Sequence, residues 1–235
     1  KKKLGLFLSM IRFHMIGLHR SLFADRVLAE MMAPISPEGD SLFWDYLGRR
    51  FVSLSYDEAD RFCQYSREFI TSLLPKDPIY LSLLPPNARA AVAQVHSETK
   101  SARAMLERLG FEYRNFVDPF DGGPHLDVKT DEIPPVANTH TRTVANAVAA
   151  TKCTEMCIVS KLDSDGEFLA IHEKVSLVDG NAISLTKECM QALEVEKGDE
   201  VGVTPMNFFA KPAANVASTT KKTTRKKTSK SGSKR

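Results

Sequence analysis

Apolar residues recur at helical spacing in the first half of the chain. A first helix is expected from the positions of Leu8, Ile11 and Leu18, which return about once per helical turn. Further apolar faces predict helices over residues 41–51, 56–74, 88–95 and 101–109. Asn87 is expected to cap the helix over 88–95, and Gly110 follows the last one, where a left-handed C-cap is favourable.

Stretches rich in β-branched and aromatic residues predict strands. A short buried strand is expected over 26–31, and a half-buried strand over 111–117. Further strands are expected over 157–160, 167–175, 183–186 and 200–203, together with a short helix over 187–193. This order of elements indicates a mixed α/β fold of the α+β type. We expect a small β-rich subdomain over 152–208 and an irregular linker over 131–151, where no period is evident.

Charge is distributed unevenly along the 235 residues. Nine of the 32 basic residues follow Ala210, where no acidic residue occurs, so the preceding body is acidic. The segment 209–235 has almost no large apolar side chain and is expected to be disordered, because it cannot offset the entropy of ordering. Two interpretations of this basic tail stay open, a contact with the phosphates of nucleic acid or of an anionic membrane surface, and a solubilising extension without a partner.

Cysteine spacing and hydropathy exclude several classes of protein. The four cysteines form no paired C-x-x-C sets, which argues against a zinc site and favours free thiols in a reducing compartment. No apolar run reaches membrane-spanning length and no signal peptide is evident. We therefore expect a cytoplasmic protein with no metal and no membrane span.

The stretch 91–128 carries most of the candidate chemistry. His96 ends an apolar stretch and precedes Ser-Glu-Thr, a position that suits either a hydrogen-bonding residue at a helix end or a catalytic acid. Its spacing alone does not decide between the two. Gly122-Gly123-Pro124 permits a tight turn and a close backbone approach to a ligand, although the same residues often form only a corner.

A set of short motifs occurs in consistent order between Leu4 and Met206. The set comprises Leu8-Ser9-x-x-Arg12-Phe13, Ala29-Glu30-Met31, Phe43-Trp44-x-x-Leu47-Gly48-Arg49-Arg50-Phe51, Ala59-Asp60, Pro78-Ile79-Tyr80, Gln94-Val95-His96, Ala102-Arg103, Gly110-Phe111-x-Tyr113-Arg114-Asn115 and Phe120-Asp121-Gly122-Gly123-Pro124. With these motifs the chain resembles the arginine N-succinyltransferases of the acyl-CoA N-acyltransferase (GNAT) superfamily. The resemblance implies a GNAT-like acyltransferase fold over 1–130 that lacks its N-terminal part, with the β-rich subdomain following it.

The resemblance also implies an activity and a set of site residues. The family transfers a succinyl group from succinyl-CoA, a cosubstrate, to the α-amino group of L-arginine during arginine breakdown. It assigns the histidine of Q-V-H as proton donor, which is His96 here. Gly5 matches a glycine of the CoA-binding turn. Because an acidic group beside permissive backbone suits a guanidinium, Asp121 with Gly122 is expected to line the arginine pocket, and capping of the turn is an equally open role for Asp121. Homo-oligomers and hetero-oligomers are both compatible with this expectation.

Two departures from the family pattern leave alternatives open. Lys3 and Leu4 stand where the CoA turn usually has Gly-Asn, and Met32 stands where the family usually has arginine. The substrate could therefore be another amine or another acyl-CoA. The competing hypothesis is a non-catalytic, acyltransferase-like binding scaffold whose basic tail contacts nucleic acid.

Overall fold

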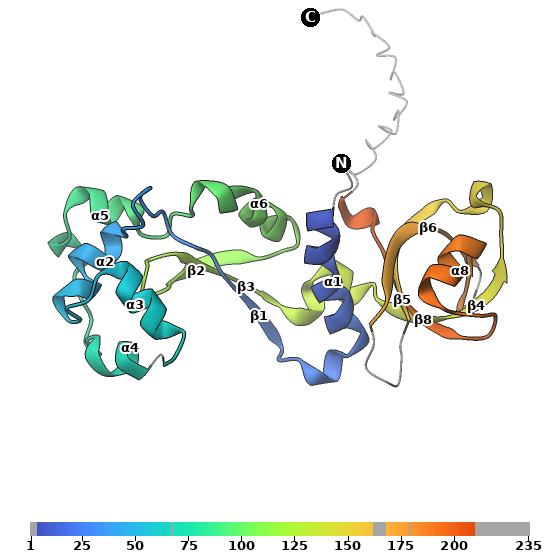
Figure 1. Cartoon of the computed structure of the whole chain (residues 1–235), viewed down its shortest axis with the longest axis horizontal. Coiled ribbons are helices and arrows are strands. Elements are labelled where there is room, and N and C mark those ends of the chain that lie inside the picture. The colour runs from blue at the N-terminus through green and yellow to red at the C-terminus, as the bar shows by residue number, and fades with distance from the viewer. Residues whose placement is uncertain (1–3, 67, 162–167, 179, 210–235) are drawn as a thin grey trace, which may run out of the picture.

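The computed structural model describes residues 4–66, 68–161, 168–178 and 180–209. These residues form three parts in a row (Figure 1): a helical lobe at one end, a three-stranded sheet with two helices in the middle, and a closed barrel at the other end. Helix and strand are thus mixed, as the sequence predicts. The predicted basic tail lies outside the described residues from position 210 onward.

The middle part is an antiparallel sheet in the order β1-β3-β2. Its strands are β1 (Arg26–Glu30), β2 (Glu112–Val117) and β3 (Pro124–Lys129). Helices α1 (Leu4–Leu18) and α6 (Lys100–Arg108) share one core with the sheet, and Leu126 of β3 is completely buried there. The opposite face carries no such cluster among the described residues. The strand predicted over 26–31 is confirmed as β1, but its predicted burial is wrong, because β1 alternates between exposed and half-buried positions.

Local sequence signals explain how α6 leads into β2. The amide of Gly110 donates to the carbonyl of Glu107 at 3.1 Å, and the amide of Phe111 donates to Leu106 at 3.1 Å. This pair of bonds is a Schellman C-cap, and Gly110 has the positive φ of 92° that the motif requires. The predicted helix end and the strand that follows it are both confirmed.

The helical lobe differs from its prediction in three places. It contains α2 (Leu42–Tyr46), α3 (Tyr56–Cys63), α4 (Glu68–Leu73) and α5 (Pro86–Ala91). The helix expected over 41–51 ends early and continues as a 3₁₀ turn, and the one expected over 56–74 is interrupted between α3 and α4. The helix expected over 88–95 begins at Pro86, stops at Ala91 and has Asn87 inside its first turn, so Asn87 is not its cap.

Trp44 holds the lobe together. Its side chain is fully buried, its indole N–H donates to the carbonyl of Leu54 at 3.0 Å, and its ring packs on Phe120 with a centroid distance of 4.8 Å. Short 3₁₀ turns complete the described chain at Arg20–Leu22, Gly48–Arg50, Leu81–Leu83, Ser97–Thr99, Thr130–Glu132, Ala150–Lys152 and Asn207–Phe209.

The barrel closes in the strand order β4-β7-β6-β5-β8. Its strands are β4 (His140–Ala147), β5 (Glu155–Lys161), β6 (Ala170–Val178), β7 (Ala182–Leu185) and β8 (Glu200–Pro205), and α8 (Lys187–Leu193) packs against them. The linker predicted over 131–151 is therefore wrong, since it contains α7 (Pro134–Ala137) and the strand β4. Only Val144 of β4 is fully buried, which explains why its sequence shows no clear alternation.

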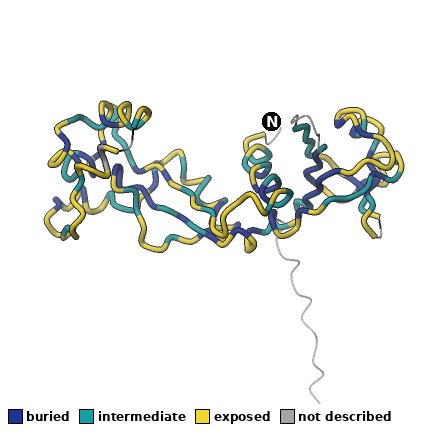
Figure 2. Tube along the Cα trace, turned by 90° about the horizontal axis from the view of Figure 1, so that it is seen from below, coloured by how far each residue is buried: buried dark blue, intermediate teal, exposed yellow. Residues whose placement is uncertain are grey.

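Helix α1 joins the sheet to the barrel. His14 is fully buried, and its Nδ1 and Nε2 atoms lie 2.6 Å from Thr204 Oγ1 and 2.7 Å from Ser160 Oγ respectively. Thr139 Oγ1 extends this network to Thr204 at 2.6 Å. Burial lowers the pKa of His14 to about 4, so the imidazole is neutral at physiological pH. Figure 2 shows buried residues along α1 and along the barrel strands beside it.

Candidate active site

His96 lies in the segment between α5 and α6, immediately before a 3₁₀ turn. Its backbone amide donates to the carbonyl of Met32 at 2.8 Å, and its side chain is half-buried. The Nδ1 atom accepts the amide of Glu98 at 3.3 Å. Because Nδ1 is the acceptor, the proton of the neutral imidazole resides on Nε2. This tautomer makes Nε2–H the hydrogen-bond donor of the ring.

The chain around His96 is tied to the turn before β3. The amide of Ala93 donates to the carbonyl of Gly122 at 2.8 Å. Ala93 has a φ of 62°, a left-handed conformation that is uncommon for a residue with a Cβ. This segment therefore contacts the turn through Ala93 and the end of β1 through His96.

Both carboxylate oxygens of Asp121 accept hydrogen bonds from backbone amides. Oδ2 accepts the amide of Ala33 at 3.0 Å, and Oδ1 accepts the amide of Gly123 at 2.7 Å. Burial raises the pKa of Asp121, while these two hydrogen bonds oppose the rise. Gly122 has a φ of 80°, and a Cβ at this position would lie 2.8 Å from the Phe43 ring. The structure thus brings together three of the four predicted site residues, His96, Asp121 and Gly122.

Gly5 lies elsewhere, in the first turn of α1. It lines a hollow of about 500 Å³ between α1 and α6, together with Ser9, Ser101 and Arg108. A Cβ at Gly5 would meet no atom within 4 Å, so packing does not require glycine here. Sequence reasoning missed Ser101 and Arg108, since only the packing of α6 against α1 places them beside Gly5.

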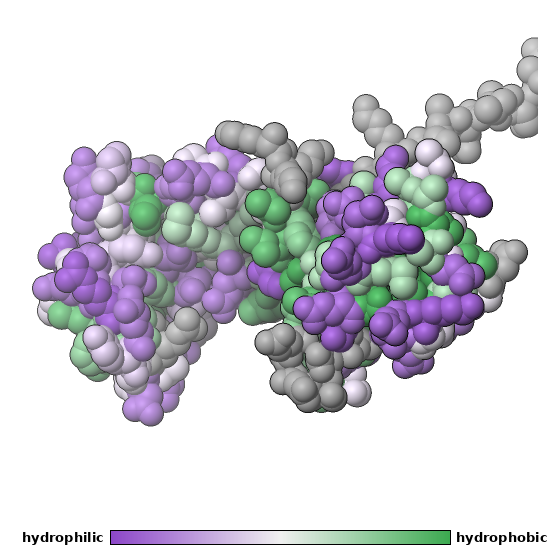
Figure 3. Space-filling model, turned by 45° about the vertical axis from the view of Figure 1, so that its right-hand side comes forward, coloured by the Kyte–Doolittle hydropathy of each residue, from purple (hydrophilic) through white to green (hydrophobic). Residues whose placement is uncertain are grey.

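Two further hollows lie away from these residues. The larger, of about 940 Å³, lies between the start of α1 and the barrel and includes Phe7, whose ring stacks on His172 at 5.7 Å. In Figure 3, apolar surface extends over α1 and the neighbouring barrel, with charged side chains around it. His96 lines none of the three hollows named here.

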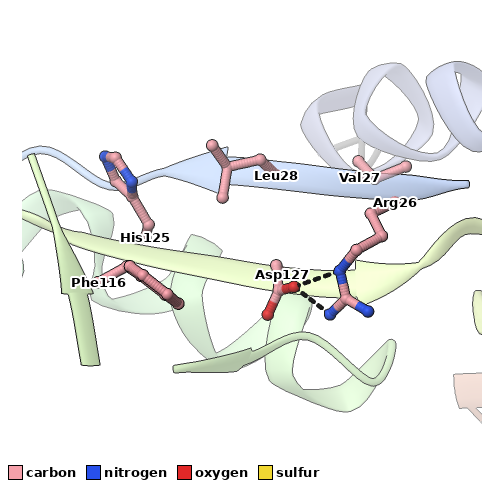
Figure 4. Close-up of a pocket in the computed structure, with 6 residues that line it drawn as sticks. All are labelled: Arg26, Val27, Leu28, Phe116, His125 and Asp127. Atoms are coloured by element: carbon pink, nitrogen blue, oxygen red, sulfur yellow. Dashed lines mark hydrogen bonds and ion pairs between the residues drawn. The ribbon is translucent and has the colours of Figure 1, made fainter. Parts of the chain in front are cut away.

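The smallest hollow, of about 240 Å³, lies on the open face of the sheet (Figure 4). Phe116 and Leu28 line it with exposed apolar side chains, and Asp127 lies between two arginines. Arg26 Nε and Arg114 Nε donate to Asp127 at 2.7 Å and 2.9 Å. The charge of Asp127 is therefore paired with arginines of the same sheet.

The described residues contain neither a cluster of metal ligands nor a helix that could span a membrane. No group of three or more histidine, cysteine, aspartate or glutamate side chains lies close enough to hold a metal ion within that part of the chain. All four cysteines are free thiols. None of the helices in the described ranges is both long and apolar enough to cross a membrane.

Comparison with known proteins identifies the family. The model of the arginine N-succinyltransferase beta subunit family matches residues 1–135. An arginine N-succinyltransferase of Enterobacter sp. (strain 638) is 38% identical over 200 residues, which are 84% of this chain and 57% of the relative. One from Yersinia pseudotuberculosis serotype O:3 (strain YPIII) is 36% identical over 212 residues, 88% of this chain and 60% of the relative.

A solved structure agrees with these relatives. The arginine/ornithine succinyltransferase subunit AI from Pseudomonas aeruginosa superimposes with a TM-score of 0.69 at 30% identity, covering 84% of this chain and 56% of that one. The chain thus spans less than two thirds of the length of the proteins it matches. Since the family model covers more than half of its residues, the chain belongs to the arginine N-succinyltransferase family.

Proposed function

We propose that this protein takes part in the transfer of a succinyl group from succinyl-CoA to the α-amino group of L-arginine. The observation that carries the proposal is the fixed His96, whose Nδ1 accepts the Glu98 amide, so that Nε2–H is the available donor. Membership of the family supports the choice of substrates.

The chemistry of the reaction explains why such a donor is needed. The neutral amine attacks the thioester carbonyl, an oxyanion develops, and the C–S bond breaks as CoA leaves. The departing sulfur takes a proton from Nε2 of His96, and the proton that the attacking nitrogen loses as it becomes an amide returns to Nε2. A positioned general acid of this kind typically contributes roughly 100- to 10,000-fold to the rate. Succinyl-CoA acts as a cosubstrate in this scheme, with no tightly bound cofactor.

We place the CoA phosphates at the start of α1. This helix is 15 residues long, and the first turn of a helix, where Gly5 lies, presents backbone N–H groups that favour an anion. The hollow between α1 and α6 provides room beside them, with Arg108 and two serines in its lining. The packing of both helices on one face of the sheet supports a GNAT-like arrangement over residues 1–130.

The arginine side of the proposed site is the turn at Asp121 and Gly122. Each oxygen of Asp121 accepts one amide, and a carboxylate oxygen has a second lone pair that can accept a guanidinium N–H. Met32, which is 38% exposed, lies between the end of β1 and Ala33, whose amide Asp121 binds. Arginine metabolism and free thiols both fit a cytoplasmic protein.

The proposal is tested by succinyl-CoA-dependent release of free CoA, measured on the polypeptide as its gene encodes it, with arginine, ornithine or lysine as acceptor. We expect arginine-dependent release that falls at least tenfold in His96→Ala. His19→Ala, at an exposed histidine on another element, should retain the full rate. Absence of release with all three acceptors, or an equal rate in the His96 variant, contradicts the proposal.

A further inference from the structure

Three chain segments that are distant in sequence meet at the proposed catalytic centre. They are residues 31–33 after β1, residues 93–96 between α5 and α6, and residues 121–123 before β3. The amide of Met31 also donates to the carbonyl of Pro124 at 3.1 Å, which continues the β1–β3 pairing toward this junction. Their mutual placement therefore fixes the backbone that bears His96.

The Asp121 carboxylate joins the first of these segments to the third. Its two oxygens accept the amides of Ala33 and Gly123, and the residue is only 9% exposed. Hydrogen bonds to an ionised acceptor are shorter and stronger than those between neutral groups. A Cβ at Gly123 would collide with the carbonyl oxygen of Met31, so the two backbones nearly touch at this point. The carboxylate thus bridges two segments of the chain whose backbones are in close contact.

The His96 segment is attached beside both ends of this bridge. The His96 amide donates to the carbonyl of Met32, whose peptide group also contains the Ala33 amide bound by Asp121. The Ala93 amide donates to the carbonyl of Gly122, whose peptide group likewise contains the Gly123 amide bound by Asp121. Each peptide group therefore binds Asp121 on one side and the His96 segment on the other.

We propose that Asp121 is a positioning residue for His96, because it polarises and holds both peptide groups to which the His96 segment is bound. This inference rests on the proposed function for its catalytic meaning. Polarised peptide groups are better acceptors, since hydrogen bonds in a chain strengthen one another. Through them Asp121 keeps Ala93 in its left-handed conformation and directs Nε2 of His96 toward the reacting sulfur.

The first test requires no turnover. Amide hydrogen exchange is measured by NMR on the ¹⁵N-labelled chain without substrate, for the wild type, Asp121→Asn and the control Asp118→Asn. The control removes a carboxylate from the same loop, where the side chain of Asp118 accepts the amide of Phe120 at 2.8 Å. We expect the Ala93 and His96 amides to exchange at least tenfold faster in Asp121→Asn. Amides of the barrel strands β5 and β8 serve as the reference for folding.

The outcomes separate the possibilities clearly. Unchanged exchange at both amides in Asp121→Asn overturns the inference, and so does equal acceleration in the Asp118 control. Equal acceleration throughout the barrel indicates a general loss of stability and also counts against it. If Asp121→Asn does not fold, Asp121→Ser, which retains one acceptor oxygen, replaces it in the same comparison.

The second test addresses catalysis, and only it depends on the proposed function. A positioning role predicts that kcat falls at least tenfold in Asp121→Asn, in addition to any rise in KM for arginine from the lost contact with the guanidinium. A rise in KM with unchanged kcat instead assigns Asp121 to substrate binding alone and overturns the positioning role. If the wild type shows no turnover, the proposed function fails while the exchange experiment still decides whether Asp121 fixes the His96 segment.

Discussion

Acidification is predicted to weaken the attachment of α1 to the barrel through a single residue, His14. The folded state holds its imidazole neutral between two hydroxyl groups, and burial lowers its pKa from 6.5 to about 4. In the unfolded chain the same group takes up a proton near pH 6.5. Between these two values the unfolded state binds more protons, so stability falls as the pH falls.

The size of the effect follows from the two pKa values. Lowering the pH from 7.5 to 5.0 should cost about 2 kcal/mol of unfolding free energy through His14 alone, and the full loss below pH 4 is about 3 kcal/mol. Other titrating groups add their own pH dependence. The prediction therefore concerns the difference between the wild type and a variant that lacks this imidazole.

Urea unfolding at pH 7.5 and 5.0, followed by circular dichroism, measures this difference. His14→Gln should lose stability at pH 7.5, because its amide fits the two hydroxyl groups less well, but its further loss at pH 5.0 should be about 2 kcal/mol smaller than in the wild type. His19→Gln, at the exposed histidine near the end of α1, removes only the smaller cause of the lowered His14 pKa, the repulsion between the two imidazolium charges, and should therefore retain most of the wild-type pH dependence. An identical pH dependence in His14→Gln refutes the reasoning.

Three further substitutions test the packing. In urea titrations Leu126→Ala, at a fully buried position, should lower the unfolding free energy by about 2–5 kcal/mol, whereas Leu28→Ala on the open face should change it by less than about 0.5 kcal/mol; equal effects would mean that the faces are misassigned. Gly122→Ala should lower the thermal midpoint, since its φ of 80° and its contact with Phe43 disfavour a Cβ by at least about 1–2 kcal/mol; an unchanged midpoint argues against this turn. Ser55→Ala removes the capping box with Glu58 and should cost about 0.5–2 kcal/mol in the same titrations, while Ser53→Ala should be neutral; equal values would contradict the cap.

The sequence predicts elements best where their signals are local. Gly110 predicts the end of α6 because the Schellman bonds join residues within a few positions of it. The interruption between α3 and α4 also has a local signal, since Ser66 Oγ accepts the amide of Glu68 at 3.2 Å. The helical spacing of apolar residues continues across this position, so the sequence predicts one uninterrupted helix. Strand β4 has no such signal, because its partners β7 and β8 lie far along the chain.

The candidate site was predictable only in part for the same reason. His96, Asp121 and Gly122 follow from motifs in a short stretch of sequence, and the structure brings them together. Their arrangement depends on the backbone of Met32 and Ala33, about 60 residues or more away. Backbone groups carry no residue-specific signal in a sequence. The fold was therefore needed to show how Asp121 and His96 are connected.

The central claim is tested most directly by identifying the product and measuring whether its formation depends on His96. The polypeptide encoded by the gene is incubated with succinyl-CoA and L-arginine, and mass spectrometry follows the succinylated amino acid over time. The account predicts arginine carrying succinyl on its α-amino group, formed at least tenfold more slowly by His96→Ala. Absence of succinylarginine with the wild type, or equal formation by the His96 variant, would contradict it.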